Sequence, residues 1–304
     1  MRRRTVVSRT TGMSHDAIVA HSPPWCSPMT DSFDLARYFA RIGYDGPAEP
    51  TLDVLRTLHL RHPRAIPFEN LDPLTGTRVA LDLPSVVDKL VQRRRGGYCF
   101  ELNKLFYTAL TTIGFRVTPL IARVRWMRPP EVATAKTHML LRVDLDDTVW
   151  FADVGFGTAT LTAPMRFAPG ERQTTPHGAF RIDAHGDDEF DMQCETRDGW
   201  QTMYRFALKP AEWVDYDAAN WFTSTYPESL FVNDLIACRV LPEGQATLFN
   251  TVLSVRDATG AAQTVTFEDR AAWAACLRDT IAIDTTGFDL DALFARAAAR
   301  TREQ

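Results

Sequence analysis

The segment Arg95-Gly96-Gly97-Tyr98-Cys99-Phe100-Glu101-Leu102-Asn103 joins two predicted helices. The first helix is expected over residues 84–95, and the two glycines that follow allow a sharp turn and a close approach to another group. The second is predicted over residues 99–113, because apolar residues recur on one of its faces at helical spacing. Cys99 therefore begins a helix, where the partial positive charge favours the thiolate form.

Around this segment the character of the chain changes from helical to extended. Helices are also predicted over 31–43 and over 51–60, the latter closed by Pro63, so the first 115 residues are mainly helical. Beyond them, β-branched and aromatic residues alternate, which predicts strands. The predicted strands are 116–126, 138–145, 148–154, 179–184, 188–196, 200–208, 234–241, 245–256 and 262–269, and the later helices are 211–223, 268–277 and 289–302. The chain is thus predicted to begin with helices, to continue with antiparallel strands and to end with a mixture of both. This order of elements predicts the α+β class.

The length and composition indicate a folded protein of several units. A chain of 304 residues suggests two or three packed domains, and 45% apolar residues are typical of folded proteins. We predict a disordered tail over 1–28, where three prolines prevent a continuous helix, with folded sequence from about Met29. A helical domain over 29–115, a domain of antiparallel strands over 116–210 and a mixed domain over 211–304 are expected to follow.

Charge and cysteine content narrow the classes of partner. The net charge of −4 gives no reason to expect nucleic acid, and no apolar run is long enough for an export signal or a membrane span. Five cysteines are too few for a disulfide framework, so they are interpreted as thiols of a reducing, cytoplasmic compartment. His59 and His62 have no further ligand nearby in the sequence, so no metal is expected. The oligomeric state is not predicted.

A reactive thiol needs a base and a third group that orients the base. His138 opens one apolar strand and Asp153 ends the next, with Asp146-Asp147 as the predicted hairpin turn. With this turn, two residues face each other across the hairpin when their numbers sum to about 293. Asp153 then lies opposite Leu140, two residues from His138 on the same strand, so His138 and Asp153 lie close together on one face. With Cys99, they favour a Cys–His–Asp triad. The alternatives are a small buried cysteine, a core histidine and an aspartate that caps a loop.

Four sequence blocks, taken in order and spacing, resemble the arylamine N-acetyltransferase family of bacterial type. The blocks are Ile66-Pro-Phe-Glu-Asn-Leu71, Arg95–Asn103, Thr137-His-Met-Leu-Leu141 and Asp153-Val-Gly-Phe-Gly157, with a weaker fifth at Asn220–Phe231. The resemblance covers roughly residues 31–290. It implies a helical first domain, a β-barrel-like second domain and an α/β third domain that acts as a lid, around a cysteine-protease-like Cys-His-Asp core.

The resemblance also implies a reaction. Acetyl-CoA is the expected donor, and an arylamine or arylhydrazine the expected acceptor. Transfer is expected in two steps through an acetylated Cys99, with His138 as the base and Asp153 as the group that orients it.

Further positions are assigned by resemblance alone. Phe68, Val124 and Phe156 match family positions near the acceptor ring, although core packing explains each of them equally well. Trp126 and Tyr226 match positions near coenzyme A. Many bacterial members have histidine where this chain has Tyr226, which puts the donor contacts there in question. Glu69 and Asn70 either brace the cysteine segment or cap a helix.

Several other functions remain open. An amide synthase or N-acyltransferase of the same family would take its acyl group from a polyketide carrier protein, propionyl-CoA or malonyl-CoA. A thiol hydrolase would use the same three residues to cleave amides without an amine acceptor. A non-catalytic binding domain would have a Cys99 of ordinary reactivity.

Overall fold

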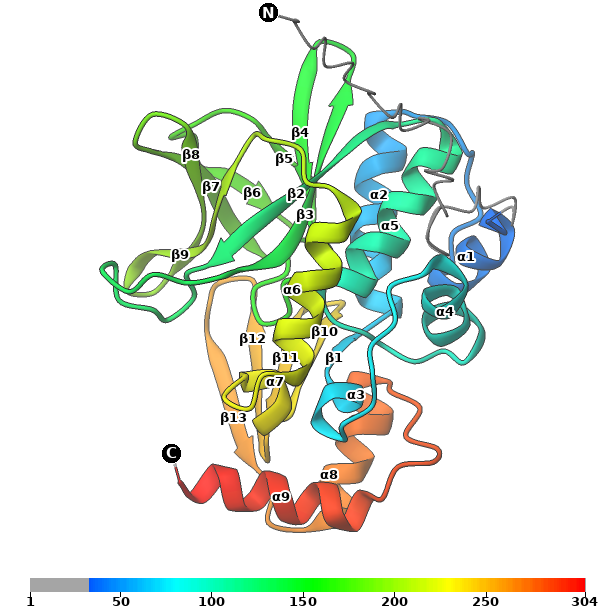
Figure 1. The fold of residues 1–304 in the computed structure, drawn as a ribbon, viewed down its shortest axis with the longest axis vertical. Helices are drawn as coiled ribbons and strands as arrows, with labels where there is room; N and C mark the ends of the chain where they lie inside the picture. The colour runs from blue at the N-terminus through cyan, green and yellow to red at the C-terminus, as the bar shows by residue number, and fades with distance from the viewer. Residues whose placement is uncertain (1–32, 304) are drawn as a thin grey trace, which may run out of the picture. The chain divides into compact units, whose positions relative to one another are not determined.

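An eight-stranded antiparallel sheet occupies the middle of the sequence and curves into a barrel-like shape (Figure 1). The computed structural model describes residues 33–303. The order of the strands in this sheet is β5-β4-β3-β2-β9-β8-β7-β6. Their bounds are Arg116–Val124 (β2), Lys136–Leu145 (β3), Thr148–Ala152 (β4), Met165–Arg166 (β5), Gln173–Thr175 (β6), Gly178–His185 (β7), Glu189–Thr196 (β8) and Gly199–Ala207 (β9). Apart from the short β5 and β6, these strands confirm the sequence prediction.

The β3–β4 hairpin has the predicted register. Leu145 pairs with Thr148 and Leu141 pairs with Ala152, so the numbers of paired residues sum to 293. The turn lies at Asp146, whose φ of 51° is in the left-handed region that aspartate tolerates. The register therefore sends His138 and the end of β4 to the same edge of the sheet.

Helices form most of the chain before the barrel. The bounds are Leu35–Ile42 (α1), Leu52–Ala65 (α2), Leu71–Leu74 (α3), Leu83–Val87 (α4), the short π-helix Asp88–Gln92 (η2) and Cys99–Ile113 (α5). The prediction that Pro63 ends the second helix is wrong, because α2 continues to Ala65. The buried His62 bonds to Tyr38 and packs against Phe106, and this packing outweighs the backbone hydrogen bond that proline removes.

A second antiparallel sheet lies near the end of the chain. Its order is β1-β10-β11-β12-β13, with bounds Phe68–Glu69 (β1), Ile236–Leu241 (β10), Gly244–Phe249 (β11), Val252–Asp257 (β12) and Ala262–Thr266 (β13). The prediction of one strand over 245–256 is wrong, because a tight turn at Asn250 divides it into β11 and β12. Asn250 adopts a φ of 54°, which asparagine tolerates better than most residues.

The remaining helices follow the barrel in the sequence, and those nearest the end of the chain pack against the second sheet (Figure 1). They are Trp213–Thr225 (α6), Leu230–Asn233 (α7), Arg270–Ala275 (α8), the short π-helix Cys276–Ile281 (η3) and Leu290–Arg302 (α9). Trp273, Leu277 and Leu293 bury their side chains in one apolar core with residues of β10 and β11. The predicted tail over 1–28 lies outside the described residues.

Candidate active site

Cys99 is the first residue of α5, as the sequence predicted. The side chain of Glu101 fixes this helix start, because one of its carboxylate oxygens accepts the backbone N–H of Tyr98 at 3.0 Å. The thiol is buried, with 4% of the residue exposed, and its sulfur lies 3.6 Å from the carbonyl oxygen of Thr137. The start of α5 is thereby set against the strand that carries His138.

His138 and Asp153 form a direct pair. The Nε2 atom of His138 lies 2.7 Å from the Oδ2 atom of Asp153, and both residues are buried. A hydrogen bond between the side chains of Cys99 and His138 also contributes to the protonation of the imidazole. The structure thus brings together the three residues of the predicted triad, from one helix start and two ends of a hairpin.

Three further groups hold Asp153 in place. Its Oδ1 atom accepts hydrogen bonds from Nδ2 of Asn103 and from the backbone N–H of Gly155, both at 2.9 Å. Its own backbone N–H donates to Nε2 of His59 at 3.1 Å. Because Oδ2 is engaged by His138, both oxygens of this buried carboxylate are satisfied.

The protonation states follow from these contacts. Burial opposes the charged form of His138, but the charge and hydrogen bond of Asp153, with a contribution from Cys99, raise its pKa to about 10. Burial likewise opposes ionisation of Asp153, yet His138 and the other hydrogen bonds lower its pKa. Burial lowers the pKa of His59 to about 4, so this ring is neutral and can accept a hydrogen bond. At neutral pH the pair is an imidazolium and a carboxylate.

Gly155 lets the end of the hairpin approach α5. A Cβ atom at this position would lie 3.0 Å from both the Cα atom of Cys99 and the Nδ2 atom of Asn103. A side chain here would push the Asp153 segment away from the thiol. The glycine is therefore required by the close approach of two backbones.

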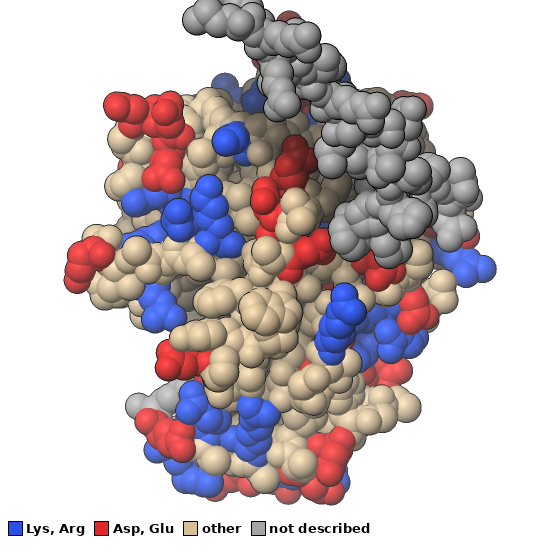
Figure 2. Space-filling view, viewed as in Figure 1, with Lys and Arg blue, Asp and Glu red and all other residues tan. Residues whose placement is uncertain are grey.

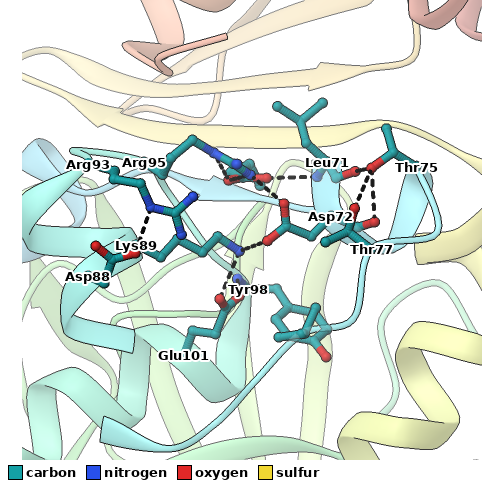
Figure 3. Close-up of polar contacts among 12 residues, drawn as sticks. Leu71, Asp72, Thr75, Thr77, Asp88, Lys89, Arg93, Arg95, Tyr98 and Glu101 are labelled. Carbon is teal, nitrogen blue, oxygen red and sulfur yellow. Dashed lines mark hydrogen bonds and ion pairs between the residues drawn. The ribbon is translucent and has the colours of Figure 1, made fainter. Parts of the chain in front are cut away.

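A buried ionic network braces the loop before Cys99 (Figure 3). Arg95 donates to Glu69 at 2.6 Å and to Asp72 at 2.9 Å. Lys89 donates to Asp72 at 2.6 Å and to Glu101 at 2.8 Å, and so joins the two acidic ends of the network. Each cation therefore shares its charge between two carboxylates, and the loop that contains Gly96 and Gly97 is held between them.

Two of the three arginines before Cys99 are paired with carboxylates. Arg93 pairs with Asp88 at 2.8 Å, and Arg95 is bound to Glu69 and Asp72. Through its bond with Arg95, Glu69 braces the cysteine segment, which was one of its two predicted roles. The cap interpretation of Asn70 is wrong, because its side chain makes no cap hydrogen bond and instead bonds to the backbone between Phe231 and Ile236.

Aromatic rings surround His138. Phe156 meets the imidazole edge to face with ring centroids 5.3 Å apart, and Tyr204 lies at 4.7 Å. Val124, the last residue of β2, pairs with Tyr204, and Trp126 contacts Phe156 at 6.0 Å. Val124, Trp126 and Phe156 therefore lie close to one another beside the imidazole.

Phe68 and Tyr226 occupy different surroundings. Phe68 is buried in β1, and a Cβ atom at Gly157 would lie 3.4 Å from its ring. Tyr226 follows α6, is 41% exposed and stacks on Phe222 with ring centroids 4.9 Å apart. The surface over α6 and α7 is largely uncharged in Figure 2. Exposed apolar side chains there are Val214, Trp221, Phe222, Tyr226 and Leu230.

Sequence reasoning missed three residues of this site. Asn103 lies four residues after Cys99, so helical spacing places both on one face of α5 and could have identified it. His59, in α2, was interpreted as an ordinary histidine of a helix surface or core, yet it accepts the backbone N–H of Asp153. Tyr204 comes from β9, and no local pattern indicates its contact with His138.

Between residues 33 and 303, no group of three or more His, Cys, Asp or Glu side chains is arranged to hold a metal ion. In the same part of the chain, no helix is long and apolar enough to cross a membrane. Cys194, Cys238 and Cys276 are free, buried thiols, and burial raises the pKa of the first two to about 11.

Comparison with known families now defines the class of this protein. A family model described as N-acetyltransferase matches residues 51–289, which include the cysteine, the histidine and the aspartate described above. The match extends over both sheets and most of the helices. The chain is therefore an enzyme of the acyltransferase class.

Individual relatives narrow the class further. An arylamine N-acetyltransferase of Escherichia coli (strain K12) is 46% identical over 217 residues, or 71% of this chain and 76% of the relative. One from Mycobacterium tuberculosis (strain ATCC 25618 / H37Rv) is 40% identical over 89% of this chain and 95% of the relative. The structure of Mycobacterium marinum arylamine N-acetyltransferase in complex with CoA matches with a TM-score of 0.83 and 40% identity, over 87% of this chain and 98% of that one. The chain belongs to the arylamine N-acetyltransferase family, and the resemblance inferred from its sequence is confirmed.

Proposed function

We propose that this protein transfers an acetyl group from acetyl-CoA to the nitrogen of an arylamine or arylhydrazine through an acetylated Cys99. The observation that carries the proposal is the buried His138–Asp153 pair at 2.7 Å, set beside a thiol at the start of α5. Membership of the family supports acetyl transfer to arylamines. The CoA bound to the Mycobacterium marinum relative supports the same donor here.

The first step acylates the cysteine. The pKa of about 10 keeps His138 protonated at neutral pH, and in the proposed scheme this imidazolium pairs with Cys99 as the attacking thiolate. The thiolate attacks the thioester carbonyl carbon of acetyl-CoA, and the carbon–sulfur bond to coenzyme A breaks. His138 gives its proton to the departing sulfur. The products are S-acetyl-Cys99, free coenzyme A and a neutral imidazole.

The second step deacylates the cysteine. The amine nitrogen attacks the carbonyl carbon of S-acetyl-Cys99, and neutral His138 takes the proton that the nitrogen loses. The carbon–sulfur bond to Cys99 breaks and restores the thiolate–imidazolium pair. An arylamine is mostly neutral at pH 7, so it can attack without first losing a proton. The amide product is more stable than the thioester, which makes the step downhill.

Asp153 acts on the imidazole in both steps. Its Oδ2 atom accepts the hydrogen bond from Nε2 of His138, which leaves Nδ1 for the exchange of protons with the sulfur and the substrate. The bonds from Asn103 and Gly155 to Oδ1 hold the carboxylate ionised and correctly oriented. The ring is thus fixed in one tautomer and one position.

The acceptor is assigned to the aromatic side of His138. Phe156 contacts the imidazole edge, and Val124 lies on the strand beside it. Phe68 packs close to Gly157, next to Phe156 in the chain. Apolar and aromatic walls suit the flat ring of an arylamine. Trp126 and Tyr226 are assigned to coenzyme A by family resemblance, and the exposed Tyr226 ring is free to contact an adenine.

Initial-rate kinetics and mass spectrometry test the two-step scheme. With acetyl-CoA and an arylamine as varied substrates, double-reciprocal plots are expected to be parallel. Incubation with acetyl-CoA alone should acetylate Cys99 and release one equivalent of coenzyme A. Cys99→Ala should abolish transfer and leave the thermal unfolding transition intact, and Cys194→Ala is the control that keeps activity. Intersecting plots without any acetylated Cys99 would refute the scheme.

The same assay separates the alternative donors and reactions. Propionyl-CoA, malonyl-CoA and an acyl carrier protein replace acetyl-CoA in parallel reactions with the same amine. Fastest turnover of acetyl-CoA supports the proposal, whereas turnover of only a carrier-bound acyl group supports an amide synthase. Release of free acid at the same rate with and without amine supports a hydrolase.

A further inference from the structure

An open cleft lies between α1, α2, the loop before Gly96, β10, η3 and the segments around Thr162 and Thr174. Its volume is about 1750 Å³, larger than the ~300–1,000 Å³ of typical small-molecule pockets. None of the residues that line it belongs to the Cys99–His138–Asp153 site. Its chemistry must therefore be explained separately from acetyl transfer.

The lining of this cleft is strongly cationic. Nine of the described lining residues are arginines, and only one, Asp284, is acidic. Four of the arginines are balanced by acidic partners: Arg56 by Asp53, Arg93 by Asp88, Arg95 by Glu69 and Asp72, and Arg278 by Asp279. The other five, within the described part of the chain, form no salt bridge. They are Arg41, Arg61, Arg64, Arg94 and Arg239.

Four of these five guanidinium groups, all except that of Arg94, donate hydrogen bonds to backbone carbonyl oxygens. Arg41 is 7% exposed and donates to the carbonyl oxygens of Leu90 and Ala65 at 2.9 and 2.5 Å. Arg239 donates to the carbonyl oxygen of Arg64 at 2.8 Å, and Arg61 donates to that of Gly43. Carbonyl oxygens carry no net charge, so these bonds orient the cations without neutralising them.

The cations also act on one another. Burial, together with the charges of Arg94 and Arg239, lowers the pKa of Arg41 to about 10. Like charges that face one cleft repel each other, and the repulsion is relieved when an anion binds among them. The Nε atom of Arg64 is buried without a hydrogen-bond partner among the described residues, so one donor remains free in the lining.

Arg94 provides a second, independent observation. Its backbone adopts a φ of 54°, the left-handed region that glycine occupies without strain and arginine does not. Such conformations persist where the surrounding structure enforces them, and they cluster at functional sites. The guanidinium of Arg94 makes no side-chain hydrogen bond or salt bridge within residues 33–303, so the fold itself does not require it.

We propose that this arginine-lined cleft binds a small anion that carries two or more linked phosphate groups. Guanidinium groups match phosphate oxygens in pairs, and five uncompensated cations call for more negative charge than one phosphate supplies. The described lining contains no aromatic residue, so no aromatic ring there can stack on a base. Recognition therefore falls on the phosphates, whether they come from an inorganic oligophosphate or from a nucleotide.

The proposal is tested by calorimetric titration of the full chain with tripolyphosphate at low ionic strength. Arg94→Gly removes one cation and relieves the backbone, so the melting temperature should stay or rise while the affinity falls about tenfold or more. Arg61→Gln should weaken binding to a similar extent. Arg302→Gln removes an exposed charge of α9 outside the cleft, and its affinity should match the unaltered protein.

Titrations with other phosphate compounds define the ligand. If adenosine triphosphate binds as tightly as tripolyphosphate, the cleft recognises the phosphates alone. If adenosine triphosphate binds more tightly than tripolyphosphate, and its affinity also falls in Arg94→Gly, the source of the phosphates is a nucleotide. Inorganic phosphate that binds as tightly as tripolyphosphate contradicts the requirement for linked groups. Unchanged affinity in Arg94→Gly and Arg61→Gln, or an equal loss in Arg302→Gln, overturns the proposal.

Discussion

At the scale of single residues, the site depends on where one proton resides. His138 and Asp153 are both buried, and each stabilises the charged form of the other. An isolated buried imidazole would be neutral, as His59 is, with its pKa of about 4. Two histidines of one protein therefore differ because one faces a carboxylate oxygen and the other accepts a backbone N–H.

Replacement of the carboxylate tests this assignment. Asp153→Asn keeps the shape of the side chain but removes its charge, so the pKa of His138 should fall below its ordinary value under the effect of burial. The amide also favours the wrong imidazole tautomer, so transfer should fall by about a thousandfold or more. Imidazole titration by nuclear magnetic resonance and single-turnover acetylation measure the two effects. A variant with an unaltered His138 pKa would contradict the assignment.

The same proton links stability to pH. In the folded state the pKa of His138 is about 10, above the ordinary value of 6.5 that holds in the unfolded chain. Its contribution is therefore complete below about pH 6.5 and is lost as the pH rises through about 10. In Cys99→Ala, where no thiol at the site can exchange a proton, the free energy of unfolding should decline across this window by the slope of one proton. Asp153→Asn, measured by denaturant unfolding at each pH, should lack this slope.

At the scale of elements, buried and exposed ion pairs do different work around the loop before Cys99. Lys89 is nearly buried between Asp72 and Glu101, whereas the Arg93–Asp88 pair is about half exposed (Figure 3). Glu101 in turn fixes the start of α5 through the backbone of Tyr98. The buried network thus connects the packing of three helical segments to the position of the thiol.

Two variants compare these pairs directly. Lys89→Met leaves two carboxylates without their shared cation and should lower the free energy of unfolding by about 3–5 kcal/mol. Arg93→Gln removes an exposed pair and should cost about 1 kcal/mol or less. Chemical denaturation measures both variants. Equal effects would show that burial of the network is unimportant.

At the scale of the described unit from Asp34 onward, Asn70 ties the helical part to the second sheet. It is fully buried, donates to the carbonyl oxygens of Phe231 and Asp234 at 2.8 and 2.7 Å, and accepts the N–H of Ile236 at 2.7 Å. These bonds lie next to the β1–β10 pairing, in which Phe68 opposes Cys238. One asparagine thereby fixes the entry of the chain into β10.

The loss of this tie should affect the whole unit. Asn70→Ala leaves three backbone groups, two of them buried, without the partner that Asn70 provides, so the free energy of unfolding should fall by about 3 kcal/mol or more. Asn233→Ala is the matched control, because the side chain of Asn233 bonds only within its own loop, to Pro227 and Ser229. Its loss should cost about 1 kcal/mol. A similar cost for both variants would mean that Asn70 acts only locally.

The sequence by itself determined the local parts of this protein. The helix from Cys99 to Ile113, the β3–β4 register and its turn, and the approach of His138 to Asp153 follow from periodicity and from residues close in the chain. Patterns failed where packing outweighed a local signal, as at Pro63, or where a turn had no glycine or proline, as at Asn250.

Only the tertiary structure decided the contacts between distant segments. It placed His59 behind Asp153, Tyr204 against His138 and β1 beside β10, over separations of 94, 66 and about 170 residues in the chain. It also gathered arginines from α1, α2, β10 and a strained loop into one cleft. Such contacts arise from burial and charge summed over many residues, which no local stretch of sequence encodes.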